Sequence, residues 1–231
     1  VSLDDAAELE RSQGVLEKRG TSLISAGGIR RGAVRFDATQ HLEANLPSWQ
    51  LDSPWSLGLW VLPEGSLSCP ISRIEPTGDR RGFELLWQKG RLAVHLVHRW
   101  GVDALEVVTR ETFSPNTWHH VVVVNRGVKD EQPRLALYVD GKPATLEVRR
   151  DSLTGSIANR EPLRIGRRDE GLGFYGALDE ARVIGEALKP VQVSNWSRDE
   201  RLRPILEQPA DKRTPADTER LLSLIHISEP T

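Results

Sequence analysis

Residues 118–124, Trp-His-His-Val-Val-Val-Val, decide the fold class of this chain. Successive side chains of a β-strand point to opposite faces of its sheet. Both alternating sets are largely apolar here, which predicts a strand that is central in its sheet and covered on both sides. The next apolar run, residues 135–139, divides in the same way into two apolar faces, with Leu135, Leu137 and Val139 on one and Ala136 and Tyr138 on the other. Two packed sheets explain both patterns.

Short β-rich runs separated by turn signals extend on either side of this stretch. The clearest predicted strands are residues 55–62, 82–88, 91–98, 105–110, 118–125, 134–139 and 162–166. Lys89-Gly90 and Asp140-Gly141 each follow an apolar run, and glycine supplies the positive φ that a two-residue hairpin turn requires. The fold class predicted from this layout is all-β, an antiparallel β-sandwich with short helical flanks.

The rest of the chain has a different character. Residues 1–20 have apolar positions near helical spacing and are interpreted as the tail of a preceding element. The sandwich is predicted to span residues 21–197. Residues 198–221 are highly charged and interrupted by Pro204, Pro209 and Pro215, which indicates a linker or the start of another domain. Residues 222–231 form a separate tail.

Composition excludes several classes of partner. The 231 residues carry a formal net charge of -2 with both signs interspersed, so neither nucleic acid nor membrane insertion is predicted. Cys69 is the single cysteine, so no internal disulfide can form, and it is interpreted as a small apolar strand residue. The chain begins at Val1 and contains no methionine, so we expect a fragment whose export signal could lie upstream.

Several ordered motifs resemble one family. Residues 118–123, 137–143 and 163–166 are similar to the laminin-G-like jelly-roll, or concanavalin A-like lectin/glucanase, domain. Residues 36–37, 55–61, 176–183 and 187–193 match in the order that the family uses. The resemblance implies a jelly-roll sandwich of roughly 160 residues and a role in binding.

Two weaker resemblances concern the carboxyl-terminal part. Residues 206–215 are similar to the segment after such a domain in large planctomycete-type multidomain proteins, which implies an exported bacterial protein, periplasmic or at the cell surface. No Cys-x-x-Cys-His haem motif occurs, so haem is not predicted. The last ten residues, 222–231, look like a translated sequencing adapter and are left out of functional reasoning.

Catalysis is not predicted. Glucanases of this fold place two carboxylates on one strand, about 5 to 5.5 Å apart in retaining enzymes. No Glu-x-Asp-x-x-Glu arrangement occurs in the chain, and no Gly-x-Ser-x-Gly nucleophile motif occurs either. The pairs His95/His98 and His119/His120 are interpreted as structural, since residues an odd number apart on a strand face opposite ways.

Asp179 is the candidate metal ligand. It shares a predicted face with Ala177, Ala181 and Val183, and a buried carboxylate requires hydrogen bonds or a cation. The family resemblance implies a structural Ca²⁺ near this strand, and Asp37 could supply a second oxygen ligand. The alternative is that Asp179 accepts hydrogen bonds from backbone amides and fixes a loop.

Aromatic side chains are the candidate ligand-binding residues. Trp55, Trp60 and Trp118 are assigned to the core. Four others lie near strand ends or in a Gly-rich loop and are predicted to form a solvent-facing platform: Trp87, Trp100, Phe174 and Tyr175. The leading hypothesis is therefore a non-catalytic recognition module that binds a polysaccharide. The alternative is a structural spacer that contacts neighbouring domains of its parent protein, and dispersed or buried aromatics would favour it.

Overall fold

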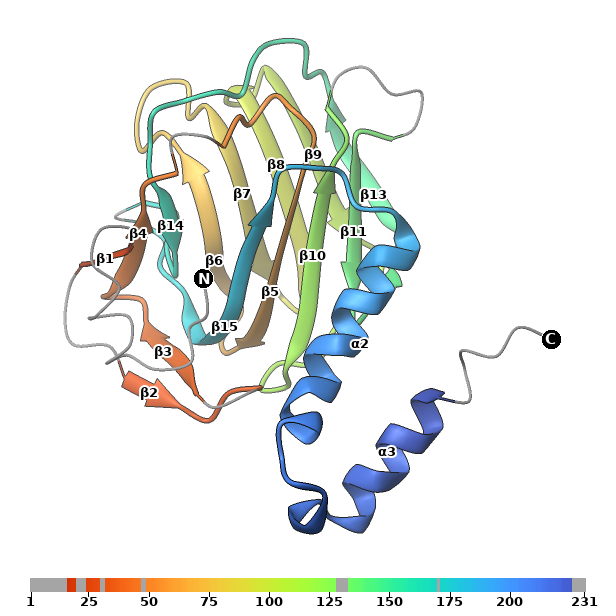
Figure 1. The fold of residues 1–231 in the computed structure, drawn as a ribbon. Helices are drawn as coiled ribbons and strands as arrows, with labels where there is room; N and C mark the ends of the chain where they lie inside the picture. The colour runs from red at the N-terminus through yellow and green to blue at the C-terminus, as the bar shows by residue number, and fades with distance from the viewer. Residues whose placement is uncertain are drawn as a thin grey trace.

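The protein is a sandwich of two antiparallel sheets followed by two helices (Figure 1). The computed structural model describes residues 16–19, 24–29, 32–46, 49–127, 133–169 and 171–225. The eight-stranded sheet has the order β1 (Leu16–Arg19), β4 (His41–Ala44), β14 (Leu163–Ile165), β6 (Leu67–Ile74), β7 (Gly82–Gln88), β8 (Arg91–Arg99), β9 (Asp103–Thr109) and β13 (Leu146–Asp151). The seven-stranded sheet has the order β12 (Lys142–Pro143), β11 (Leu135–Val139), β10 (His119–Asn125), β5 (Trp55–Pro63), β15 (Tyr175–Ile184), β3 (Ala33–Asp37) and β2 (Ile24–Ala26). The predicted all-β antiparallel sandwich is confirmed.

The predicted central strand is confirmed in detail. β10 lies between β5 and β11, and all seven of its residues are buried. Val121 and Val123 face the main core between the sheets, whereas Val122 and Val124 face a second apolar cluster on the outer side of the seven-stranded sheet. Burial on both faces explains why both alternating sets of this strand are apolar.

Both predicted hairpin turns are present. Lys89 and Gly90 have φ of 51° and 80°, and Asp140 and Gly141 have φ of 55° and 79°. Positive φ at both central residues is the geometry of a type I′ turn, whose twist matches that of the flanking strands. The turns join β7 to β8 and β11 to β12.

Helix α2 (Pro190–Leu206) covers the second apolar cluster (Figure 1). Val193 is buried there against Val122 and Tyr138. Trp196 reaches further across the sheet, since its ring meets that of His120 at a centroid distance of 5.3 Å and lies directly over Gly58 of β5. The outer face of the seven-stranded sheet is therefore closed over these strands by a helix.

The chain outside the core sandwich differs from its prediction at several points. Residues 16–19, expected in a preceding helical tail, form β1, which pairs with β4, while residues 1–15 lie outside the described part. α2 runs without a break across the expected boundary after residue 197 and includes Pro204, expected to be a breaker. Pro215, by contrast, begins α3 (Pro215–Ile225), where proline is favoured because the first helical N–H has no partner. Pro209 precedes the short 3₁₀ turn η1 (Ala210–Lys212).

Among the described residues, no helix combines the length and the hydropathy that crossing a membrane demands.

Substitution of Gly58 tests the packing of α2 against the seven-stranded sheet. A Cβ at this position would lie 2.4 Å from Cη2 of Trp196, so Gly58→Ala should push the helix off the sheet. Overpacking of this kind costs about 1–3 kcal/mol, and urea denaturation should show the corresponding loss of unfolding free energy. Gly185→Ala is the matched control, because a Cβ there meets nothing within 4 Å. Equal stability of both variants would contradict the proposed packing.

Candidate functional site

A row of polar side chains crosses the outer face of the eight-stranded sheet. The strand register places one residue of each neighbouring strand side by side, in the order Glu43, Arg164, Ser72, Glu84, His95, Glu106 and Arg150. Directly opposed side chains of an antiparallel pair lie about 4.5–5.5 Å apart at Cβ. Residues that are far apart in sequence thus form one continuous row from β4 to β13.

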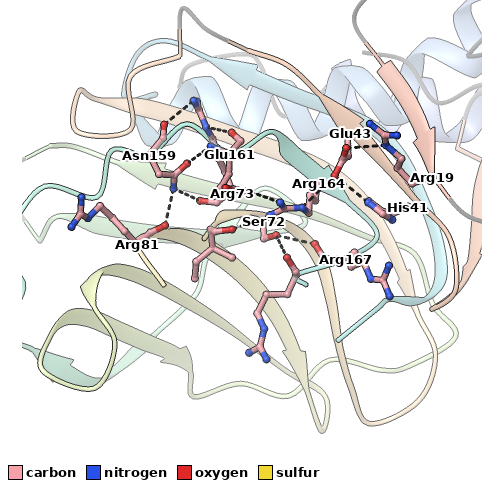
Figure 2. Close-up of polar contacts among 12 residues, drawn as sticks. Arg19, His41, Glu43, Ser72, Arg73, Arg81, Asn159, Glu161, Arg164 and Arg167 are labelled. Carbon is pink, nitrogen blue, oxygen red and sulfur yellow. Dashed lines mark hydrogen bonds and ion pairs between the residues drawn. The ribbon is translucent and has the colours of Figure 1, made fainter. Parts of the chain in front are cut away.

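The first half of this row is a local charge network (Figure 2). Glu43 lies among three basic groups, with the Nε atoms of Arg19 and Arg164 at 3.1 and 3.4 Å and Nε2 of His41 at 3.3 Å from its carboxylate oxygens. Burial raises the pKa of Glu43, but hydrogen bonds from His41 and Arg19 outweigh it and hold that pKa below its usual value. Ser72 donates from Oγ to the carbonyl of Arg167 at 2.8 Å. This half of the row is therefore internally satisfied.

Arg73 secures the loops beside this half. Its guanidinium, drawn in Figure 2, donates to four carbonyl oxygens of two loops: Trp49 at 2.8 Å, Glu161 at 2.9 Å, Asn159 at 3.3 Å and Leu46 at 3.4 Å. Burial lowers the pKa of Arg73. A planar group with five donors suits several carbonyls at once, so the residue acts as a clamp.

In the second half, Glu84 and His95 belong to a closed ring of contacts. Glu84 is fully buried, and its Oε1 lies 2.8 Å from Nδ1 of His95, whereas its Oε2 lies 3.7 Å from Nε of Arg168. The ring of His95 meets that of Trp100 edge-on at 5.8 Å. Arg80 lies over the same indole at 5.7 Å, which is within cation–π range.

Asp169 completes this ring of contacts. It accepts hydrogen bonds from Nη1 of Arg80 at 2.7 Å and from Nε of Arg168 at 3.0 Å, and from the backbone N–H of Gly171 at 2.8 Å. Burial raises the pKa of Asp169, but these hydrogen bonds outweigh it and keep that pKa below its usual value. An ionised Asp169 therefore ties the loop after β14 to the loop that carries Arg80, and so positions Trp100.

A groove of about 780 Å³ begins at His95, one of the residues in this ring of contacts. We call it the β8 groove; it is lined by Ser66, Leu67, Gln88, Lys89, Arg91, Ala93, His95, Glu106, Val107, Val108 and Arg149. The cross-strand pair Ala93 and Val108 forms its apolar middle. From Arg91 to His95 the groove extends four residues along β8, about 13 Å at the usual rise per residue. Its middle is apolar, and its two ends carry polar side chains, with the exposed Leu67 among them at the β7–β8 end.

Of the four predicted platform aromatics, two face solvent and two do not. Trp100 and Tyr175 are 40% and 51% exposed. The expectation that Trp87 and Phe174 face solvent is wrong, because both pack in the main core and are 1% and 0% exposed. The indole N–H of Trp87 donates to the carbonyl of Gly65, which satisfies its polar atom inside the sandwich.

The two exposed aromatics are not brought together. Tyr175 begins β15 beside the Pro63 end of β5, the end that also holds the β7–β8 turn. Trp100 follows β8 at the opposite end, on the other sheet. The predicted single platform is therefore absent, and only Trp100 adjoins the β8 groove, through His95.

The core assignments of the other tryptophans need one correction. Trp55 and Trp60 are buried as expected, although Trp60 lies on the outer face against His120. Trp118 is only half-buried, whereas Trp49, which was not assigned to the core, is buried there.

Asp179 is fully buried, but not on the side expected. A β-bulge at Glu180, which has φ of 49°, shifts the alternation, so that Leu178 and Ala181 face the core while Asp179 pairs with Trp60 on the outer face. Its Oδ2 accepts the backbone N–H of Ile29 at 2.9 Å and its Oδ1 accepts that of Glu180 at 2.8 Å. These contacts correspond to the alternative in which Asp179 fixes a loop.

Asp37 is not brought to Asp179. It is exposed and accepts hydrogen bonds from the hydroxyl and the N–H of Thr39, which lower its pKa. It pairs with Tyr175, four positions from Asp179 along β15, or about 13 Å. The described residues contain no group of three or more His, Cys, Asp or Glu that could hold a metal ion. The geometry therefore gives no support to a calcium site shared by these two carboxylates.

This arrangement defines a class of protein: a jelly-roll sandwich with one outer face under a helix and a groove on the other. A family model described as the concanavalin A-like lectin/glucanases superfamily matches residues 36–194, and the chain belongs to this family. No curated protein matches the chain.

Binding domains are prominent among similar solved structures. The binding domain of Paraclostridial mosquitocidal protein 1 superimposes with a TM-score of 0.59 at 16% identity, over 80% of this chain and 47% of that one. The chain thus spans about half the length of that toxin domain. Domain 4 of an extracellular arabinanase from Geobacillus stearothermophilus, solved with arabinotriose, gives 0.54 at 16% identity over 79% and 87% of the two chains. A heptameric SAP-like pentraxin from Limulus polyphemus gives 0.54 at 21% identity over 74% and 84%. At these identities the likeness establishes the fold alone.

Arg73→Met tests the clamp beside the polar row. The substitution keeps much of the side-chain volume but leaves four carbonyls without their donor, so we expect a loss of unfolding free energy of about 2–4 kcal/mol. Arg160→Met, at an exposed position of the same loop, should change it by less than about 0.5 kcal/mol. Guanidinium denaturation measures both, and equal effects would refute the clamp.

Proposed function

We propose that the domain is a non-catalytic carbohydrate-recognition module that binds a saccharide in the β8 groove. The observation that carries this proposal is the groove's make-up, with the apolar pair Ala93 and Val108 between ends that present charged and amide side chains. A sugar ring offers C–H faces to an apolar floor and hydroxyl groups to donors and acceptors at its edge. Concave sites with an apolar lining and few polar groups are the usual form of small-ligand sites.

Trp100 extends this surface. It is 40% exposed and meets His95, a residue of the groove, edge-on. The guanidinium group of Arg80, which donates a hydrogen bond to Asp169, lies over the Trp100 ring. The ring is therefore held in position before any ligand arrives. A preorganised aromatic surface loses little side-chain entropy on binding, which favours affinity.

The acids of the polar row support a non-catalytic role. Hydrolysis of a glycosidic bond generally requires two carboxyl groups that reach the substrate. Glu84 has no exposed surface and is engaged by His95 and Arg168. Glu106 is the single acid among the residues that line the groove, and it pairs with Nε of Arg150 at 3.0 Å. The other carboxylate beside the groove, Glu147, is held by Arg91 and Arg149. Carboxylates that arginines already engage favour binding over cleavage.

The arabinanase domain supports the same proposal from outside the chain, because that protein has this fold and was solved with a saccharide. We infer that the present domain takes a polysaccharide as its partner, as part of a larger exported protein.

A structural spacer remains the second candidate, and a specific observation favours it. Two of the four predicted aromatics are buried, and the two exposed ones lie at opposite ends of the sandwich. A module that only orders neighbouring domains requires no aromatic platform.

Trp100→Ala separates the two candidates. An aromatic contact is worth about 0.5–1.5 kcal/mol beyond its buried area, so affinity for a bound saccharide should fall about three- to tenfold. Tyr175→Ala is the matched control, because Tyr175 is an exposed aromatic on the other sheet and at the opposite end of the sandwich from Trp100. This substitution should leave affinity unchanged. A glycan array would select the saccharide and titration calorimetry would measure the dissociation constants.

The opposite results are equally informative. If the wild-type protein binds no saccharide on a broad array, the recognition hypothesis is wrong and the spacer hypothesis takes its place. Equal losses in Trp100→Ala and Tyr175→Ala would place the binding surface away from the β8 groove.

A further inference from the structure

The β7–β8 end of the groove carries an excess of positive charge. Lys89, Arg91 and Arg149 line it, and Glu147 forms ion pairs with the two arginines. Three cationic side chains and one carboxylate leave two positive charges in excess, on a chain whose formal net charge is -2. The excess is thus local and opposite in sign to the whole chain.

These charges are held on regular structure and open to solvent. Lys89 is the first residue of the type I′ turn, and its backbone N–H donates to the carbonyl of Ser66 at 2.6 Å, which fixes the position of its Cα. The side chain of Arg149 is 54% exposed. Lys89 is exposed and forms no ion pair within the described ranges, so its ammonium group is available to a ligand.

The two arginines already hold a carboxylate between them. Nη2 of Arg91 lies 2.9 Å from one oxygen of Glu147, and Nε of Arg149 lies 2.9 Å from the other. The hydrogen bond from Arg91 lowers the pKa of Glu147, so this carboxylate is ionised at neutral pH. The pair of guanidinium groups therefore has the spacing that binds a carboxylate.

The opposite end of the groove shows no such excess. Glu106 is paired with Arg150, and His95 is paired with the buried Glu84. A ligand that lies along β8 thus meets a balanced end and a cationic end, joined by the apolar pair Ala93 and Val108.

We propose that the β8 groove selects an acidic saccharide, whose carboxylate groups bind at the cationic end formed by Lys89, Arg91 and Arg149. This inference rests on the proposed carbohydrate-binding function and gives its substrate class. Glu147 competes for the same guanidinium groups, so it sets the affinity that a sugar carboxylate must exceed.

Binding to three immobilised polysaccharides tests the inference: polygalacturonate, which carries carboxylates, heparin, which also carries sulfates, and a neutral arabinan. We expect polygalacturonate to bind best, with affinity that falls as NaCl is raised. Lys89→Glu should weaken this binding about tenfold, since it turns attraction into repulsion at one position. Lys142→Glu, an exposed lysine on β12 of the other sheet, is the matched control and should change it less than about twofold.

A second variant tests the competition directly. Glu147→Gln removes the resident negative charge and keeps the side-chain shape, so affinity for polygalacturonate should rise about three- to tenfold. Glu219→Gln, at an exposed position of α3, should leave it unchanged. A gain of affinity is a result that a merely destabilised variant cannot imitate.

Each remaining outcome is decisive. Binding to arabinan alone, unaffected by Lys89→Glu, would overturn the acidic specificity and leave the carbohydrate function intact. Binding to heparin but not to polygalacturonate would overturn the carboxylate assignment. Equal binding to polyglutamate would reduce the effect to general attraction for polyanions and overturn the inference. No binding to any saccharide would overturn the proposed function itself.

Discussion

The packing of three aromatic rings between the sheets is the contact on which the rest of this structure depends. The ring centroids of Trp55, in the seven-stranded sheet, and Phe83, in the eight-stranded sheet, are 5.1 Å apart. The centroid of Trp49, in the loop before β5, is 5.4 Å from each of them. The indole N–H of Trp55 donates to the carbonyl of Leu51, and Arg73 lies over Trp49. These rings set which faces of the two sheets meet, and the loop clamp is built onto them.

Once the inner faces are fixed, the pleat fixes the outer ones. Burial of Leu85, Val94 and Leu105 in the core turns their neighbours Glu84, His95 and Glu106 outward, and the register then aligns those three across the sheet. The candidate site is thus a by-product of core packing rather than of loop conformation. On the other sheet the same geometry turns out Gly58, Val122 and Val124, and α2 covers them.

The sequence was sufficient wherever apolar alternation and turn chemistry agreed. All seven predicted strands are present, within about two residues at their ends, because each combines an apolar face with a clear turn signal. β6 was missed, since Pro70 lies inside it and proline argues against a strand; a register shift beside that proline accommodates it. β13 was missed because four of its six residues are charged, as suits an edge strand.

The candidate site was far harder to foresee, and the reason is physical. Its residues come from separate strands, and each one resembles an ordinary solvent-facing side chain until the register is known. Asp179 shows a related limit, because a single bulge at Glu180 reversed the face assigned to it. The exposure of Trp100 to solvent was foreseen, because its position directly after a strand is a local signal.

The position of α2 has a practical consequence for presentation. The helix covers the seven-stranded sheet, whereas the β8 groove opens on the outer face of the eight-stranded sheet, so the two lie on opposite sides of the sandwich (Figure 1). A protein anchored to a bead or sensor chip through α2 would turn its groove toward the bulk solution. One anchored through the exposed lysine of the β7–β8 turn would hide the same groove against the support.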